Sequence, residues 1–282
     1  MTALTIARLT LREAVRRKVV RALLVLTLVL LALSAWGFSK LIGLDTELGT
    51  MTSGEARLIA SLLLNLVMFG MSLIAALGTA FLAGPTVAGE VESGQALSLL
   101  ARPVRRSSVL FGKWLGLVTF GSTYVAVAGL AQIVVVRATV GYWPPSPATG
   151  LALLAAETVV LLTLALLLSS VISTMASVII AVGLFGATWG AGVVGGIGGA
   201  LGNEGVERVG TVSRIVLPTD GLWRGAMNAF QDPIARVQMG PGEGGFPFLS
   251  EAPLAPAYLA WATLWIAVIW GLTALSFQRR DI

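Results

Sequence analysis

"AGEVESGQALSLLARPVRRSSVLFGK", residues 88–113, is a short charged segment between two long apolar runs. It contains charged residues of both signs, whereas the flanking runs 58–83 and 114–136 contain none. A helix needs about 20 residues, at a rise of about 1.5 Å per residue, to cross the hydrocarbon core of a bilayer. Both runs reach that length, so the segment is expected to lie at a membrane surface and to join two spanning helices.

The composition of the whole chain is that of an integral membrane protein. Of its 282 residues, 56% are hydrophobic and 12% are charged, whereas soluble domains carry about 25% charged residues. Six apolar runs predict a single all-α transmembrane domain with spanning helices at residues 19–38, 58–83, 114–136, 150–172, 175–201 and 256–277. The fourth and fifth runs adjoin, and the chain is expected to turn back at Ser169, Ser170, Ser173 and Thr174.

The absence of two residue types excludes several kinds of chemical site. The chain has no cysteine and no histidine, which excludes disulfides, thiolate or imidazole metal sites, and nucleophilic sites built on either residue. The phosphate-binding motif G-x-x-x-x-G-K-[ST] is also missing, because Gly112 and Lys113 are followed by Trp114. The sequence therefore predicts no catalytic residue, no metal site and no cofactor bound by this chain. If ATP is used, another polypeptide must bind it.

The distribution of Lys and Arg along the chain is that of a membrane protein rather than that of a nucleic-acid-binding protein. Cytoplasmic loops of membrane proteins are enriched in Lys and Arg. With six crossings, the N-terminus, residues 84–113 and the C-terminus fall on one side, and they hold twelve of the 19 Lys and Arg residues. We therefore expect a protein of the inner (plasma) membrane with both termini and residues 84–113 in the cytoplasm, residues 202–255 outside it, and no nucleic-acid partner.

Residues 1–18 form a separate amphipathic element. Arg8, Arg12 and Arg16 recur every four residues, which places them in one stripe of a helix, while Leu4 and Leu11 fall in an apolar stripe. Two interpretations stay open. The element is either an interfacial helix attracted to anionic lipid or only a positive flank that orients the first span.

The segment between the second and third spans is expected to contain one short helix. Gly84 and Pro85 should end the second span, because proline cannot continue a helix. Residues 95–101 are good helix formers with Leu97 and Leu100 three apart, and Pro103 should stop them. So short a helix is marginal alone and is expected either to pack into a partner or to lie on head groups.

The whole segment resembles the signature of type-2 ATP-binding-cassette (ABC) transporter permeases. In that family it is the coupling helix, which docks in a groove of a separate ATPase subunit. The resemblance implies docking by Glu90, Glu92, Gly94, Gln95, Leu97, Leu100, Arg102, Pro103 and Arg106. It also implies an N-terminal elbow helix, a second permease copy or homologous permease, and two ABC ATPase subunits that bind ATP and Mg.

Several residues within the predicted spans are candidates for a translocation path or for helix packing. Glu157 is the one ionisable residue well inside a run, so it is either a path residue or a partner of Arg137. Asn65 and Gln132 could link helices by hydrogen bonds or line a path. Gly186 and Gly190 belong to a glycine-rich run that is expected to pack closely, to hinge, or to become irregular beyond Gly195.

The expected extracytoplasmic segment contains "LPTDGLWR", residues 217–224. This element is similar to a Pro-Thr-Asp element in the permease of nitrous-oxide-reductase maturation systems, which singles out Pro218, Thr219, Asp220, Trp223 and Arg224. A helix is expected over residues 220–230, capped by Thr219 or Asp220, with Trp223 as an anchor at the membrane interface. The segment would cap the outer exit, meet an extracytoplasmic protein, or form a plain surface loop.

These features predict the permease subunit of an ABC exporter-type complex, which would export a substrate or transmit force to an outer partner. The alternative is an ATP-independent secondary transporter or channel. That alternative predicts several intramembrane charges and internal repeats, and the sequence offers one buried acid and no such repeat. An intramembrane enzyme would need paired carboxylates or a Ser–Lys pair within the spans, and the spans contain neither Asp nor Lys.

Overall fold

The computed structural model describes residues 3–41, 45–46, 49–50, 53–89, 106–234, 247–250 and 252–279. Six of its helices are long and apolar enough to cross a membrane, which is the number expected from hydropathy. They are α2 (Lys18–Leu41), α3 (Ser53–Gly84), α6 (Arg106–Val140), α7 (Pro147–Val171), α8 (Thr174–Ala200) and α12 (Pro256–Arg279). The only strands in the described ranges are β1 (Asp45–Thr46) and β2 (Gly49–Thr50), which pair antiparallel between α2 and α3.

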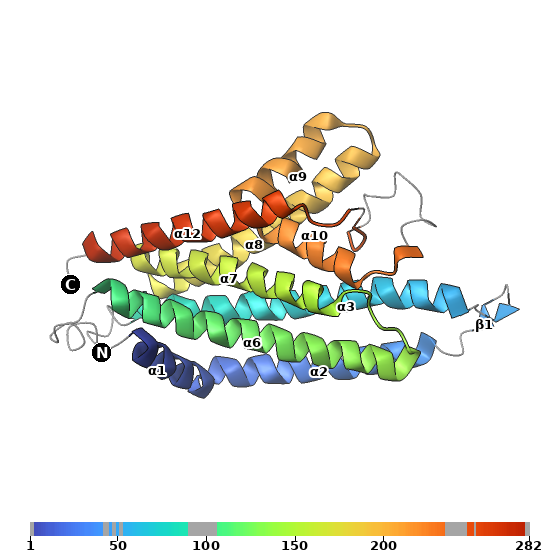
Figure 1. Ribbon diagram of the computed structural model, residues 1–282, viewed down its shortest axis with the longest axis horizontal. Helices are drawn as coiled ribbons and strands as arrows, with labels where there is room; N and C mark the ends of the chain where they lie inside the picture. The colour runs from blue at the N-terminus through green and yellow to red at the C-terminus, as the bar shows by residue number, and fades with distance from the viewer. Residues whose placement is uncertain are drawn as a thin grey trace.

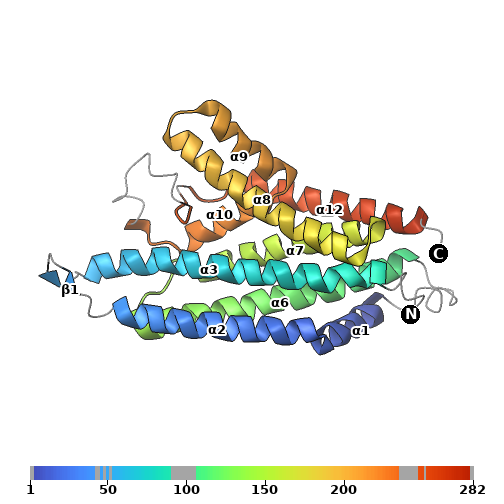
Figure 2. The ribbon, with the colours of Figure 1, turned by 180° about the vertical axis from the view of Figure 1, so that it is seen from behind.

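The long helices lie side by side along the longest axis of the molecule (Figure 1). Both termini lie at one end, and β1 lies at the other (Figures 1 and 2). Helix α7 is the most buried of the six candidate spans. It packs against α3, α6, α8, α10 and α12, so it forms the centre of the bundle.

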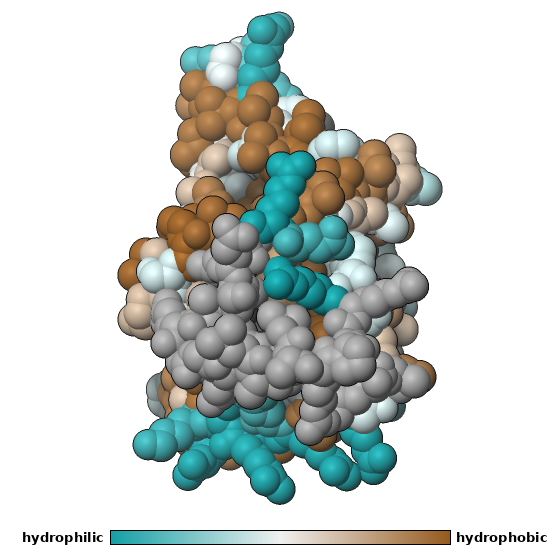
Figure 3. Space-filling model, turned by 90° about the vertical axis from the view of Figure 1, so that its left-hand side faces the viewer, coloured by the Kyte–Doolittle hydropathy of each residue, from teal (hydrophilic) through white to brown (hydrophobic). Residues whose placement is uncertain are grey.

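The N-terminal element is a separate helix, α1 (Ala3–Arg16), which is divided from α2 by a bend at Arg17. It packs closely against α6, because a Cβ atom built on Gly112 or Gly116 would lie 2.6 Å from a backbone oxygen of α1. Figure 3 views the molecule from the end that carries the termini, and hydrophilic side chains gather there on the lower edge, where α1 lies. The amphipathic helix is present, and its location in a membrane interface stays a prediction.

The α-helix of the second span ends where it was expected to end, but a π-helical turn that was not expected follows it. Helix α3 ends at Gly84, and the chain continues as a π-helical turn, η1 (Pro85–Gly89). Proline has no N–H to donate to the preceding turn, so the backbone widens there instead of keeping the regular α-helical ladder. The expected turn between the fourth and fifth spans is present, because α7 ends at Val171 and α8 begins at Thr174.

Helices α9 and α10 follow α8 in the chain. Helix α9 (Glu204–Val216) folds back along the end of α8, and α10 (Thr219–Phe230) packs against α7 (Figures 1 and 2). The expected irregularity beyond Gly195 is wrong, because α8 stays helical to Ala200. Helix α9 was not predicted. Its Asn203 cap accepts a hydrogen bond from the backbone N–H of Val206.

The predicted helix α10 is present, but two expectations about it are wrong. Pro218 occupies its N-cap position and no side chain caps it, so neither Thr219 nor Asp220 has that role. Trp223 is not an interface anchor, since it is 2% exposed within a core that includes Leu222, Phe230 and Tyr142. The Tyr142 hydroxyl donates to the Phe230 carbonyl, and burial, aided by the charge of Asp232, raises the pKa of this tyrosine.

Candidate functional site

Most of the predicted docking residues lie outside the described part of the chain. These are Glu90, Glu92, Gly94, Gln95, Leu97, Leu100, Arg102 and Pro103. Arg106 is described as the first residue of α6, and its Nη1 donates to the carbonyl of Gln278 at 3.5 Å. The structure therefore gives the two anchor points of the segment, Gly89 and Arg106, and links the second of them to the end of α12.

The first anchor point is held by side chains from two other helices. Lys113 of α6 extends its Nζ to the carbonyl of Thr86, at 3.0 Å. Ser169 of α7 donates its hydroxyl to the carbonyl of Gly84, at 2.5 Å, and accepts from the N–H of Ala88, at 3.0 Å. We call this arrangement the π-turn clamp; it comprises Gly84, Thr86, Ala88, Lys113 and Ser169.

The clamp gives side-chain hydrogen bonds to backbone groups at the end of α3 and in the π-turn. Lys113 is 7% exposed and Ser169 is fully buried, so water cannot easily replace either side chain. Helix α8 also touches this point, because a Cβ atom on Gly84 would lie 2.6 Å from Val178. The clamp thus joins the end of α3 to α6 and α7 directly before residue 90.

Glu157, the buried acid of α7, does not pair with Arg137. Glu157 is 2% exposed and accepts a hydrogen bond from Ser72 of α3 at 2.9 Å. Arg137 lies over the ring of Trp143 instead, 5.0 Å from its centroid. The predicted pair is therefore wrong, and depth explains why. Arg137 is in the last turn of α6, whereas Glu157 lies ten residues into α7, which is about 15 Å along its axis.

Two buried amides link neighbouring segments. Gln132 of α6 exchanges two hydrogen bonds with Ser34 of α2, at 2.8 and 3.0 Å. Asn65 of α3 donates its Nδ2 to the carbonyl of Phe248 at 3.1 Å, while its Oδ1 has no partner among the described groups. Gln132 therefore links two helices, which is the first of the two roles considered, whereas Asn65 links α3 to the non-helical residues 247–250.

The glycines of α8 divide into two sets. A Cβ atom built on Gly186 or Gly190 would have no atom within 4 Å, so these two do not pack against another part of the described chain. The close contacts occur further along, where Gly192 meets Asp220, Gly195 meets Gly210 and Gly198 meets Val206. The expected close packing is thus displaced toward the end of the helix, where α9 and α10 cross it.

The Pro-Thr-Asp element centres on a buried carboxylate. Asp220 is 2% exposed, and its Oδ2 accepts from Nε of Arg214 at 2.8 Å and from Nε of Arg224 at 3.1 Å. Arg224 also donates to the carbonyl of Gly192 at 2.7 Å, and Thr219 shares a hydrogen bond with Thr188. We call Arg214, Asp220 and Arg224 the Asp220 cluster. Arg214 joins α9 to α10 through Asp220, and Arg224 joins α10 to α8 through Gly192. The two arginines also supply the positive charge that a buried carboxylate requires.

Arg214 was missed by sequence reasoning. It lies six residues before Asp220 and in a different helix, so no helical spacing connects the two. Only the fold of α9 against α8, which was not predicted, brings them together. The local signal in the sequence is Arg224, four residues after Asp220, a spacing that places the two side chains on one face of a helix.

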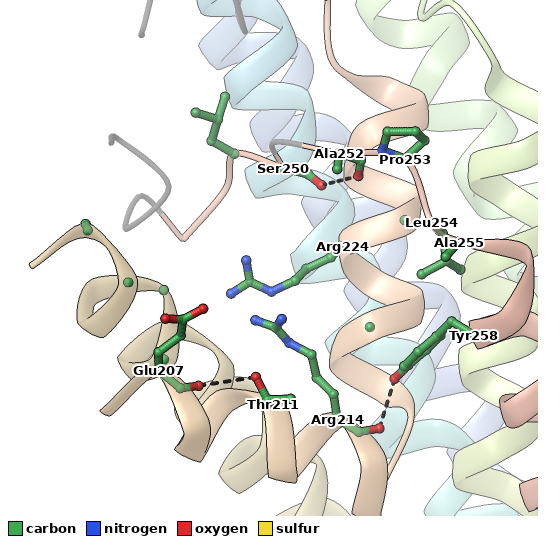
Figure 4. A pocket seen from close by; sticks show the side chains of 17 residues that line it. Glu207, Thr211, Arg214, Arg224, Ser250, Ala252, Pro253, Leu254, Ala255 and Tyr258 are labelled. Carbon is green, nitrogen blue, oxygen red and sulfur yellow. Dashed lines mark hydrogen bonds between the residues drawn. The ribbon is translucent and has the colours of Figure 1, made fainter. Parts of the chain in front are cut away.

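A cavity of about 610 Å³ lies beside the Asp220 cluster. Glu207, Thr211 and Arg214 line it from α9, Arg224 lines it from α10, and residues 252–255 with Tyr258 line a further side (Figure 4). The hydroxyl of Tyr258 donates to the carbonyl of Arg214 at 3.0 Å, which holds the end of α9 against the start of α12.

The comparisons with known proteins agree with the architecture. No curated protein matches the chain. The family described as ABC-2 family transporter protein matches residues 4–282. Six apolar helices and that match together make this a multi-pass membrane protein whose family implies an ABC ATPase partner. The chain belongs to the ABC-2 family of transporter proteins and is a membrane subunit of an ABC transporter.

Proposed function

We propose that this subunit converts ATP hydrolysis by a separate ABC ATPase into movement of its spanning helices, either to export a substrate or to transmit force across the membrane. The π-turn clamp carries the proposal. It lies at the point where the segment that contains the docking residues leaves α3, and it binds that point to α6 and α7 through Lys113 and Ser169.

The contacts suggest a path for the movement. A shift of residues 90–105 would act on Gly89 and Arg106 together. The π-turn clamp would transmit the movement of Gly89 to α3, α6 and α7. The bond from Arg106 to Gln278 would transmit the movement of Arg106 to α12. Small displacements at such an interface can move whole helices, because packed helices shift as rigid bodies.

The proposed complex contains two ATPase subunits, which bind ATP and Mg, and a second permease copy or a homologous permease. We place it in the plasma membrane with both termini in the cytoplasm. The cationic stripe on α1 supports this orientation, since Arg8, Arg12 and Arg16 are exposed at the end that carries both termini. Pro218, Thr219, Asp220, Trp223 and Arg224 would then be extracytoplasmic, near the surface available to an outer protein.

Reversal of the acidic pair tests the docking role. Glu90→Lys and Glu92→Lys should each reduce copurification of the ATPase, because a lysine would replace an acid at the proposed contact, while the permease still inserts. Glu204→Lys is the matched control, since Glu204 is 83% exposed at the other end of the molecule. An unchanged complex with unchanged ATP turnover in the Glu90 and Glu92 variants would remove the docking role of the segment.

A further inference from the structure

The cavity beside the Asp220 cluster is lined by groups of opposite charge. Arg214 and Arg224 share one carboxylate, so the Asp220 cluster has two positive charges against one negative charge. Glu207 contributes a negative charge from α9, and no described residue forms an ion pair with it within 4.0 Å. Figure 4 shows its carboxylate and both guanidinium groups turned toward the same open space.

The guanidinium groups keep unused donors. Each Nε is bound to Asp220, and one terminal nitrogen of Arg224 is bound to Gly192. Within the described ranges, nothing accepts a hydrogen bond from the terminal nitrogens of Arg214, whose side chain is 28% exposed. A guanidinium held in this way presents its remaining N–H groups in a fixed fork, which suits the oxygens of a phosphate or carboxylate.

The cavity also lies where spanning helices end. Gly195 and Gly199 line it from the last turns of α8, and Tyr258 lines it from the first turn of α12. Helix ends of spanning length reach the level of lipid head groups, since the apolar core is only about 30 Å thick. The volume, about 610 Å³, is within the usual range for small-molecule sites.

We propose that this cavity binds a zwitterionic phosphodiester, the chemistry of a phosphoethanolamine head group. Its singly charged phosphate faces Arg214 and Arg224, and its primary amine faces Glu207. The net single positive charge of the Asp220 cluster matches a phosphodiester monoanion, and Glu207 matches the amine, so the occupied site is neutral. The head group comes from a membrane lipid or from a soluble compound, and the experiment separates these sources.

The test uses the full chain purified in detergent, with bound lipid counted by native mass spectrometry during titration with phosphatidylethanolamine or phosphatidylcholine. Phosphatidylethanolamine should bind more tightly, because the quaternary ammonium of choline has no N–H for Glu207. Arg214→Gln should weaken that binding about tenfold or more. Arg208→Gln is the matched control, because Arg208 lies on the same helix, pairs with the exposed Glu204, and is not part of this cavity.

One further variant and one further ligand test the role of Glu207 and the source of the head group. Glu207→Gln alters an exposed side chain and should remove the preference for ethanolamine over choline without loss of folding. Titration with glycerophosphoethanolamine, followed by calorimetry, identifies a soluble source if it binds as well as the lipid, and a lipid source if it does not. Equal binding by Arg214→Gln and Arg208→Gln, or equal binding of both lipids by the unmodified chain, would overturn the proposal.

Discussion

At the scale of single residues, the buried polar groups are the most informative features of this protein. Glu157, Asn65 and Gln132 could be selected from the sequence because polar residues are rare within apolar runs. Their partners could not be selected. Their partners Ser72, Phe248 and Ser34 are brought to them by packing between segments that are distant in the chain. Sequence position gives the depth of a residue in a span but not the face of the neighbouring helix that it meets.

Removal of the Ser169 hydroxyl should weaken the π-turn clamp. Ser169→Ala leaves the buried carbonyl of Gly84 and the N–H of Ala88 without this partner, which costs about 1–3 kcal/mol. We expect a lower melting temperature and a lower rate of ATP turnover in the assembled complex. Ser170→Ala is the control, because among the described residues the Ser170 hydroxyl bonds only to Leu167 of its own helix. Equal behaviour of the two variants would show that the clamp has no mechanical role.

Neutralisation of Asp220 should destabilise the protein strongly. Asp220→Asn leaves two partly buried arginines without their shared carboxylate, and loss of one partner of a buried ion pair costs about 3–5 kcal/mol. Glu204→Gln breaks an exposed pair with Arg208 and should cost only about 0–1 kcal/mol. Thermal unfolding of both variants in the same detergent measures the difference. Similar unfolding temperatures would contradict the structural role of the Asp220 cluster.

At the scale of elements, hydropathy predicts the six spans because each must cover the apolar core of a bilayer. The same signal misses α9, whose Glu204, Glu207, Arg208 and Arg214 give it the composition of a loop. It also misses the π-turn at Pro85, because proline predicts an interruption of the helix but not the form that the interruption takes. Short amphipathic elements are thus the part of this fold that depends most on packing.

The contact between α1 and α6 should depend on a glycine spacing of four residues. A side chain at Gly116 would collide with the backbone of Ala7, so Gly116→Leu should displace α1 from α6. Trypsin should then cut faster at the arginines of α1. Gly37→Leu is the control, since it adds the same side chain to a helix where no atom lies within 4 Å. Equal cleavage rates in the two variants would contradict the packing of α1 on α6.

At the scale of the whole molecule, the contacts divide between the two ends. The π-turn clamp and the bond from Arg106 to Gln278 lie at the end that carries the termini. The Asp220 cluster and its cavity lie where α8 meets α9. The sequence predicted important residues at both ends from their charge and their resemblance to a family. It could not predict the clamp, which needs three helices to converge.

The proposed orientation has a direct consequence for labelling. The chain has no native cysteine, so single introduced cysteines report cleanly on sidedness. In intact cells, a membrane-impermeant maleimide should label Glu204→Cys at once. Leu97→Cys should react only after the membrane is permeabilised. The reverse pattern would place the proposed docking segment outside the cell and would contradict the orientation.

The most direct test of the account is photo-crosslinking from residue 97 in living cells. A benzophenone amino acid at position 97 should give a product that contains this chain and an ABC ATPase subunit. The same amino acid at Leu264, which is half exposed in the middle of α12, should not. The account predicts ATPase product from position 97 alone. No ATPase product from position 97, together with full activity of the purified chain by itself, would contradict it.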